Sequence, residues 1–151
     1  RNPYNFGTTT VASADTRRQL YAAVFSSVSG TFAADEEINQ ASTGAVGKVV
    51  EYDSTNKLLY WYQTRFPDVG TDSDGNATAF SGANAITGQT SSASATPNTS
   101  SSTDVNGVSI TSGYSNPELA ADSGDIIYVE ERSPITRASD QTENIKLIIE
   151  F

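Results

Sequence analysis

Acidic residues supply most of the side chains in this chain that are suited to acid–base chemistry. The 151 residues contain neither histidine nor cysteine, so the commonest general base, the thiolate nucleophile and the usual zinc ligands are missing. Two adjacent acidic pairs remain, Glu36–Glu37 and Glu130–Glu131. Paired carboxylates can hydrolyse a glycosidic bond, but neighbours on a strand point to opposite faces. We interpret both pairs as solvated or interface charges and predict that the chain is not an enzyme.

Two glycine-containing stretches look like ligand-binding loops but do not meet their requirements. The stretch DSDGN, residues 72–76, has Gly70 and Ser81 where a calcium loop needs its first acidic ligand and its bidentate glutamate. In STGAVGKVV, residues 42–50, Lys48 is followed by valine, whereas a phosphate-binding loop needs serine or threonine and then a helix. We therefore predict a turn and a strand here, with no metal, no cofactor and no small-molecule substrate.

The acidic charge of the chain makes some classes of binding partner improbable. Nine Lys and Arg face eighteen Asp and Glu, for a formal charge of −9 and a pI near 4.2. Such a chain repels nucleic acid and anionic lipid, because binding to both relies on cationic side chains. No apolar run approaches the roughly 20 residues of a membrane span, and no signal-peptide pattern is present. Methionine is also absent, and we expect the chain to be a fragment of a longer polypeptide.

The first 67 residues predict an extended N-terminal segment, residues 1–16, followed by a small β module, residues 17–67. Residues 17–28, RRQLYAAVFSSV, carry apolar residues every four positions, as in an amphipathic helix. They are also rich in β-favouring Tyr, Val and Phe and run into the turn-forming sequence SGT. We favour a strand over a helix.

Residues 47–66 form the clearest predicted hairpin. GKVVEYD and LLYWYQTRF flank STNK, in which Asn56 suits the left-handed conformation of a tight reversal. Because side chains alternate along a strand, large residues fall on both faces of its second half, with Leu58, Tyr60 and Tyr62 on one and Leu59, Trp61 and Arg65 on the other. One face covers a core, and the other must meet another sheet, a loop or a partner.

The run Tyr60-Trp61-Tyr62 is the most attractive binding feature of this hairpin. Exposed on a sheet, such rings would stack on sugars or anchor a protein interface. Buried, they would be core, which is the commoner place for large aromatic side chains.

Residues 68–104 change in composition to mostly Ser, Thr, Gly, Asn and Ala. So little apolar surface would not offset the cost of ordering the backbone, about 1–2 kcal/mol per residue. We predict a flexible insertion or long surface loop, with a docking segment ordered by its neighbours as the alternative.

Residues 105–151 return to strand patterns, strongest in DIIYVEE and IKLIIEF, residues 125–131 and 145–151. The residues between them are too many for an ordinary hairpin loop of roughly 2–5 residues, so we expect a structured polar corner. Pro134 should end the pairing of the first strand. Asp140 is placed to accept from the Glu143 amide in a helix-start capping box. Arg132 and Arg137 each supply a guanidinium group that can bind these acids or a partner's carboxylate through two hydrogen bonds.

The stretch SGDIIYVEERSPITRASDQTENIKLIIEF, residues 123–151, resembles the C-terminal end of the baseplate wedge subunit of T-even-type contractile-tailed phages, the gene product eight family. The resemblance is ungapped and rests on Ser123, Gly124, Ile127, Tyr128, Glu130, Arg132, Pro134, Ile135, Asp140, Gln141, Thr142, Glu143, Ile145 and Phe151.

The resemblance implies a structural virion protein of the tail baseplate with no enzymatic activity and no cofactor. Its expected partners are other wedge subunits and a second copy of itself, with assembly in the bacterial host cytoplasm. The interface would be the corner formed by Tyr128, Glu130, Arg132, Pro134, Arg137, Asp140, Gln141, Thr142 and Glu143.

Taken together, the patterns predict a mainly β chain of small barrel or sandwich modules with long loops and little helix. The leading functional hypothesis is a baseplate wedge subunit that works through protein–protein interfaces. The alternative is a secreted carbohydrate-binding or adhesin module that stacks sugars on Tyr60, Trp61 and Tyr62.

Overall fold

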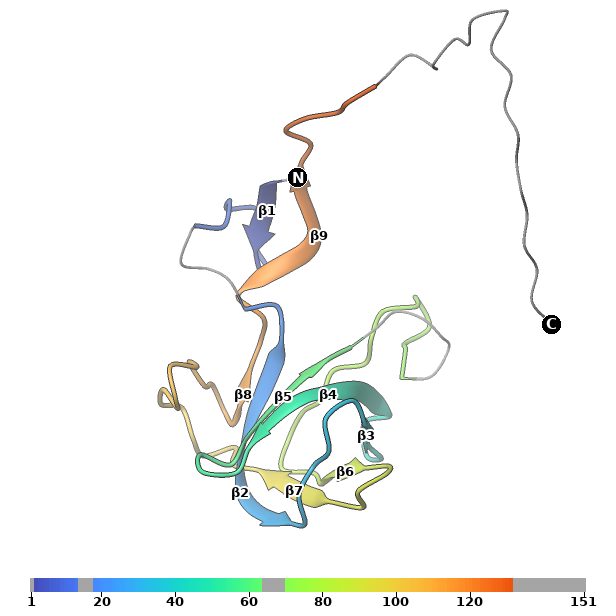
Figure 1. The fold of residues 1–151 in the computed structure, drawn as a ribbon, viewed down its shortest axis with the longest axis vertical. Helices are drawn as coiled ribbons and strands as arrows, with labels where there is room; N and C mark the ends of the chain where they lie inside the picture. The colour runs from blue at the N-terminus through green and yellow to red at the C-terminus, as the bar shows by residue number, and fades with distance from the viewer. Residues whose placement is uncertain (1, 14–17, 64–69, 132–151) are drawn as a thin grey trace, which may run out of the picture.

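The computed structural model describes residues 2–13, 18–63 and 70–131, which contain strands and no helix (Figure 1). The predicted mainly β class is confirmed. The strands are β1 (Asn2–Asn5), β2 (Tyr21–Ser29), β3 (Glu37–Gln40), β4 (Ala45–Asp53), β5 (Leu58–Tyr62), β6 (Ile86–Gly88), β7 (Ser94–Pro97), β8 (Tyr114–Ser115) and β9 (Leu119–Asp125).

The strands form two antiparallel sheets. The larger has the order β5-β4-β3-β6-β7-β2-β8, and β5 also pairs with β2. That second pairing bends the sheet around its core. In the described residues the smaller sheet is a ribbon of β1 and β9, with an isolated bridge from Tyr4 to Val11. It stands clear of the larger sheet in Figure 1.

Both strand predictions for the first module are confirmed. Residues 21–29 are β2, and the hairpin is β4–β5, with Tyr52 opposite Leu59 and Asp53 opposite Leu58. The turn differs in one detail, because Lys57 takes the left-handed conformation (φ 51°) and Asn56 does not. Asn56 instead donates its side-chain amide to Asp53 Oδ2 at 2.6 Å.

The two faces of β5 meet different partners, as the alternation predicts. Leu59 and Trp61 point into the main core, among residues of β2, β3, β4 and β6. On the opposite face Leu58 belongs to a second cluster with Val108 and Ile110. The second apolar face is therefore covered by the loop that precedes β8.

The prediction that residues 68–104 are a flexible insertion is wrong for the part that the structure describes. This segment supplies β6 and β7, which lie between β3 and β2 in the larger sheet. Its large described apolar side chains, Phe80 and Ile86, are buried, as are Ala93 and Ala95. The composition underestimates how well ordered this segment is. Two buried polar side chains, one just before β3 and one at its end, bind the backbone of the segment.

The first of these side chains is Glu36, just before β3, which is only 4% exposed. Its carboxylate accepts from the amides of Ala33 (2.7 Å), Thr90 (3.1 Å) and Ser91 (2.9 Å), and from the Ser91 hydroxyl (2.8 Å). Burial acts to raise the pKa of Glu36, but the bonds from Ser91, Ala33 and Thr90 outweigh it and the pKa is lowered. Glu36 thus remains a carboxylate that holds the turn between β6 and β7.

The second is Gln40 at the end of β3, which is fully buried. Its Nε2 donates to the Asn84 carbonyl (2.9 Å) and the Tyr114 hydroxyl (3.3 Å). Its Oε1 accepts from the Ser81 amide (2.9 Å) and the Thr43 hydroxyl (3.0 Å). Gln40 therefore ties the loop before β6 to β3 and β8.

The predicted strand at residues 125–131 is displaced. The strand β9 ends at Asp125, which pairs with Asn2 at the start of β1. Residues 126–131 are exposed and in neither sheet. The second predicted strand, IKLIIEF, lies outside the described residues. The division of the chain into four segments stays a prediction, although β1 and β9 join the first segment to the last.

Candidate protein interaction site

The aromatic run on β5 does not form an exposed platform. Trp61 is 1% exposed, stacks on Tyr21 at a centroid distance of 6.0 Å and meets Phe80 edge-on at 5.1 Å. Tyr60 and Tyr62 are half-buried on the opposite face of the strand. Because the central ring is core, this run gives no support to a sugar-stacking module.

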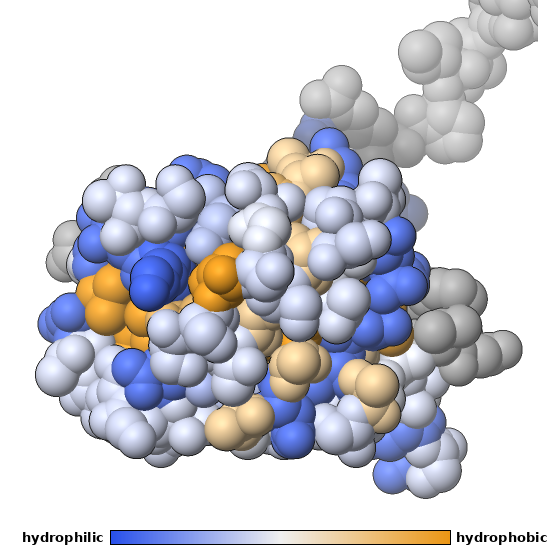
Figure 2. Space-filling view, turned by 90° about the horizontal axis from the view of Figure 1, so that it is seen from below, coloured by the Kyte–Doolittle hydropathy of each residue, from blue (hydrophilic) through white to orange (hydrophobic). Residues whose placement is uncertain are grey.

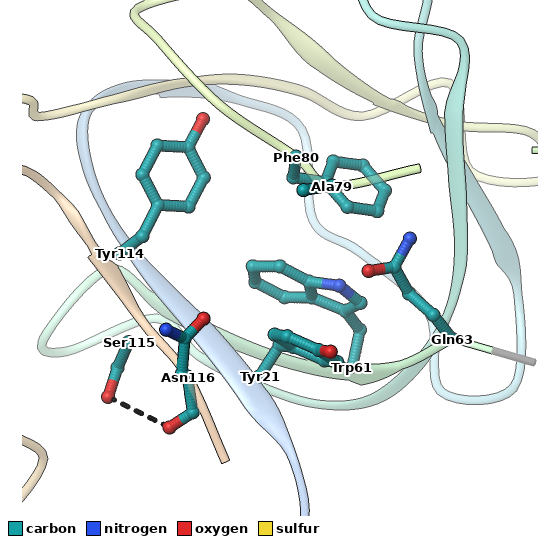
Figure 3. A pocket seen from close by; sticks show the side chains of 8 residues that line it. All are labelled: Tyr21, Trp61, Gln63, Ala79, Phe80, Tyr114, Ser115 and Asn116. Atoms are coloured by element: carbon teal, nitrogen blue, oxygen red, sulfur yellow. Dashed lines mark hydrogen bonds between the residues drawn. The ribbon is translucent and has the colours of Figure 1, made fainter. Parts of the chain in front are cut away.

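A small cavity lies beside Trp61 and is lined by Tyr21, Trp61, Gln63, Ala79, Phe80, Tyr114, Ser115 and Asn116 (Figure 3). Its volume is about 30 Å³, room for one or two water molecules but far below the roughly 300–1,000 Å³ of a small-molecule site. Trp61 Nε1 has no hydrogen-bond partner. The cavity is too small to bind a substrate.

A wider depression of about 370 Å³ lies along β8 and is lined by Ser109, Thr111, Tyr114, Ser115 and Asn116. Tyr114 is its only titratable side chain, and burial raises the pKa of that phenol. The described residues contain no group of three or more acidic side chains placed to hold a metal ion. None of their secondary structure is helical, so a bilayer-crossing helix is absent from this part of the chain. The depression offers no acid–base pair for catalysis.

The β1–β9 ribbon depends on a close crossing at Gly124. Gly124 has φ +88°, and a Cβ there would overlap the carbonyl of Asn2. Nearby, Ser123 Oγ accepts from the Tyr4 amide (3.0 Å) and donates to the Ala120 carbonyl (2.6 Å). The crossing sets the direction in which the chain leaves β9.

We expect Gly124→Ala to open the end of the ribbon, because alanine adds an overlap to the cost of a positive φ, which is itself about 1 kcal/mol. Hydrogen exchange at the Tyr4 amide should accelerate by at least about tenfold, the equivalent of 1.4 kcal/mol. The matched control is Gly75→Ala, which shares the positive φ (+76°) but has open space around its Cβ. Equal exchange at Tyr4 in both variants would contradict the crossing's role.

The ribbon is tied to the larger sheet by Arg18 and Glu118. The backbone amide of Arg18 donates a hydrogen bond to Glu118 Oε2 (2.9 Å), and the backbone amide of Glu118 donates one to the Arg18 carbonyl (2.7 Å). The guanidinium also donates to Ser115 Oγ and the Asn116 carbonyl, both at 2.8 Å, and to the Leu20 carbonyl. Burial lowers the pKa of Arg18, and the Glu118 charge acts in the opposite direction. We call this group the clasp.

Beyond the ribbon, four large apolar residues are exposed in succession, Ile126 (64%), Ile127 (72%), Tyr128 (77%) and Val129 (72%). We call residues 126–129 the apolar tail. By contrast, the side of the molecule seen in Figure 2 is mostly polar, with separate apolar patches. Among the residues that the structure describes, these four are the longest run of exposed large apolar side chains.

Only part of the predicted corner lies among the residues that the structure describes. Tyr128 and Glu130 are described and exposed, whereas the others lie outside the described residues, namely Arg132, Pro134, Arg137, Asp140, Gln141, Thr142 and Glu143. Sequence reasoning missed the clasp, since nothing in the sequence brings Arg18 to Glu118. It also missed the crossing, although a glycine inside a strand pattern is a signal of close backbone approach.

Comparison with known proteins identifies the family. The family model described as Bacteriophage T4, Gp8 matches residues 73–151, just over half of the chain. The match begins within the segment predicted to be a flexible insertion and includes β6 to β9. No curated protein and no solved structure matches the chain. The chain belongs to the Gp8 family of bacteriophage T4, whose members are baseplate wedge subunits.

Proposed function

We propose that the chain is a structural subunit of a phage tail baseplate wedge and acts only through protein–protein interfaces. Those interfaces serve virion assembly and the conformational change of the baseplate. The family match over residues 73–151 carries the proposal. The exposed apolar tail supports it, because a contiguous apolar surface of this kind marks an interaction site.

The partners that we propose are other wedge subunits and a second copy of the chain, joined in the host cytoplasm and retained in the tail baseplate of the virion. The acidic charge agrees with protein partners and not with nucleic acid. A non-enzymatic role agrees with the small cavity beside Trp61 and the lack of an acid–base pair in the depression along β8.

The corner at residues 128–143 remains part of the proposal. Its first members, Tyr128 and Glu130, directly follow the ribbon and face solvent. Polar contacts of this kind favour specificity and can rearrange when an assembly switches state. We infer that the corner sets the orientation of the subunit against its neighbours.

Mass spectrometry of purified particles tests the proposed function. Peptides of this polypeptide should be recovered in a fixed ratio to the other baseplate proteins, and a nonsense codon in its gene should yield particles without complete baseplates. Infectious particles that lack the polypeptide would refute the proposal.

We expect Arg132→Ala or Arg137→Ala to reduce the yield of assembled wedges by about tenfold, because each removes a guanidinium able to bind a carboxylate across an interface, worth about 1.5–3 kcal/mol. Thermal unfolding of the isolated chain should change little. Lys48→Ala, which removes an exposed cation on β4, is the matched control. Normal assembly by both arginine variants would remove the corner from the mechanism.

A further inference from the structure

We propose that the cavity beside Trp61 is a binding site for one ordered water molecule, which accepts a hydrogen bond from Trp61 Nε1 and donates one to Gln63 Oε1. The inference goes beyond the proposed function, because it assigns a ligand to the core of the larger sheet and does not depend on the partners of the chain. It follows from a buried donor, an acceptor that lines the same cavity and a volume that fits a water.

The indole N–H of Trp61 is a buried donor that needs an acceptor. The side chain is 1% exposed, and its Nε1 makes no hydrogen bond within the chain. Most buried polar groups in folded proteins are bonded either to a protein group or to an ordered water. The indole nitrogen can only donate, so its partner must supply a lone pair.

The indole ring is confined, so the acceptor has to come to it. Tyr21 stacks on one side of the ring, and Phe80 meets it edge-on. The ring atom next to the nitrogen, Cδ1, lies close against β4, where a Cβ on Gly47 would be only 2.6 Å away. Trp61 therefore cannot turn its nitrogen to the solvent without displacing these neighbours.

Gln63 supplies a matching acceptor. Residues two positions apart on an extended chain share a face, and both Trp61 and Gln63 line the cavity. Figure 3 draws the Gln63 carboxamide on the side of the indole ring that carries the nitrogen. Its Nε2 donates to the carbonyls of Val46 (3.1 Å) and Thr78 (2.7 Å), which uses both amide hydrogens and leaves Oε1 as an acceptor.

A water satisfies both groups better than a direct contact would. Moving Oε1 of Gln63 onto Nε1 of Trp61 would disturb the bonds that hold the carboxamide to Val46 and Thr78. A bridging water leaves those bonds intact, and such a bridge is nearly as favourable in enthalpy as a direct hydrogen bond.

The cavity has the volume and the lining that a water needs. Its volume of about 30 Å³ exceeds the roughly 10–15 Å³ that one water requires. Apolar cavities stay dry, but this lining includes the polar side chains of Gln63, Ser115 and Asn116. Tyr114, Ser115 and Asn116 also line the wider depression along β8, so they form a wall between the water site and the surface.

Water-selective NMR on the isotope-labelled chain tests the inference. The 151 residues contain a single tryptophan, so the indole N–H gives one signal. We expect cross-peaks between this proton and water, of opposite sign in the NOE and ROE spectra, as for a water held inside a protein. The Val49 amide is the internal control, because it is fully buried and donates to the Glu36 carbonyl at 2.9 Å. It should give no such peaks.

The hydroxyl of Tyr21 also lines the cavity, and the variant Tyr21→Phe separates it from a water. The substitution removes the hydroxyl and keeps a ring to stack on Trp61. The indole cross-peaks should persist in this variant. Their loss would assign the contact to the phenol and overturn the inference.

A crystal structure of the chain gives the direct view. We expect a water oxygen about 2.7–3.2 Å from Trp61 Nε1 and about 2.5–3.0 Å from Gln63 Oε1. A direct bond between Nε1 and Oε1, or a cavity without a water, would refute the inference. So would indole cross-peaks that are absent, that have the same sign in both spectra, as in proton exchange, or that are matched by the Val49 amide.

Discussion

Replacing Glu36 with alanine should lower the free energy of unfolding by about 3 kcal/mol, because four part-buried donors lose a charged acceptor, and a hydrogen bond to a charged group contributes about 1.5–3 kcal/mol. These donors are the amides of Ala33, Thr90 and Ser91 and the Ser91 hydroxyl. Since two of the three residues form the turn between β6 and β7, the loss should fall on the Ser/Thr-rich segment. Urea unfolding gives the free energy, and hydrogen exchange at Thr90 and Ser91 locates the loss.

Glu37→Ala is the matched control, because it removes the neighbouring carboxylate, which is exposed on β3. Its effect should stay within about 0.5 kcal/mol, as for most surface substitutions. If the two variants lost equal stability, the buried carboxylate would have no special part in ordering the segment.

The same carboxylate predicts how stability depends on pH. The pKa of Glu36 is lower in the folded chain than its ordinary value of 4.5, so the unfolded state binds the proton more readily. The contribution of Glu36 is therefore fully present above the unfolded pKa and is lost as the pH falls through the folded pKa. The difference in unfolding free energy between the wild type and Glu36→Gln should shrink as the pH falls below about 4.5. A difference that stayed constant down to pH 3 would contradict this account.

Gln40→Leu should cost about 2–3 kcal/mol, although leucine fills much of the same volume. The substitution leaves the Ser81 amide and the Asn84 carbonyl without the side chain that pairs with them, and each lost hydrogen bond costs about 0.5–1.5 kcal/mol. The Tyr114 hydroxyl keeps its bond to the Gly82 carbonyl at 2.7 Å, so we expect β8 to remain in place. Accelerated hydrogen exchange at Ser81 would mark the released loop.

Asn39→Leu provides the comparison for Gln40, because Asn39 is the half-buried neighbour on the other face of β3. It should cost less than about 1 kcal/mol. Similar losses in both variants would show that the polar contacts of Gln40 contribute no more than its volume.

The positions of strands are predicted correctly from the sequence where they follow from local alternation of side chains. The β4–β5 hairpin is read correctly because Leu59 and Trp61 alternate with Leu58 and Tyr60, and both sets are large enough to need burial. Strand β2 is also predicted, since its β-branched and aromatic residues outweigh a four-residue spacing that suits a helix.

The Ser/Thr-rich segment could not be predicted in the same way. Its order depends on backbone amides that donate to Glu36 and Gln40. These two acceptors lie 41 to 55 positions earlier in the chain than the donors Ser81, Thr90 and Ser91. Composition counts the apolar surface that a segment can bury, but it does not count donors that a distant side chain will satisfy. The clasp was missed for the same reason, because its two residues are 100 positions apart.

The place of the candidate site could be read from the sequence only in part, and its role as an interface stays a prediction. The sequence identified an apolar run near residue 128, and the structure shows that run open to solvent. The sequence put it inside a strand, because residues 125–131 have the right composition, but a strand also needs a neighbour. In the described residues β9 pairs with β1 as far as Asp125, opposite Asn2.

The pairing of β1 with β9 means that the chain leaves for the larger sheet and comes back to nearly the same point, where Glu118 N bonds to Arg18 O. Residues 19–117 are therefore an excursion whose two ends are already neighbours, an arrangement that tolerates exchange of the inserted body. A miniature in which a tight turn replaces residues 19–117 should keep the register of β1 against β9.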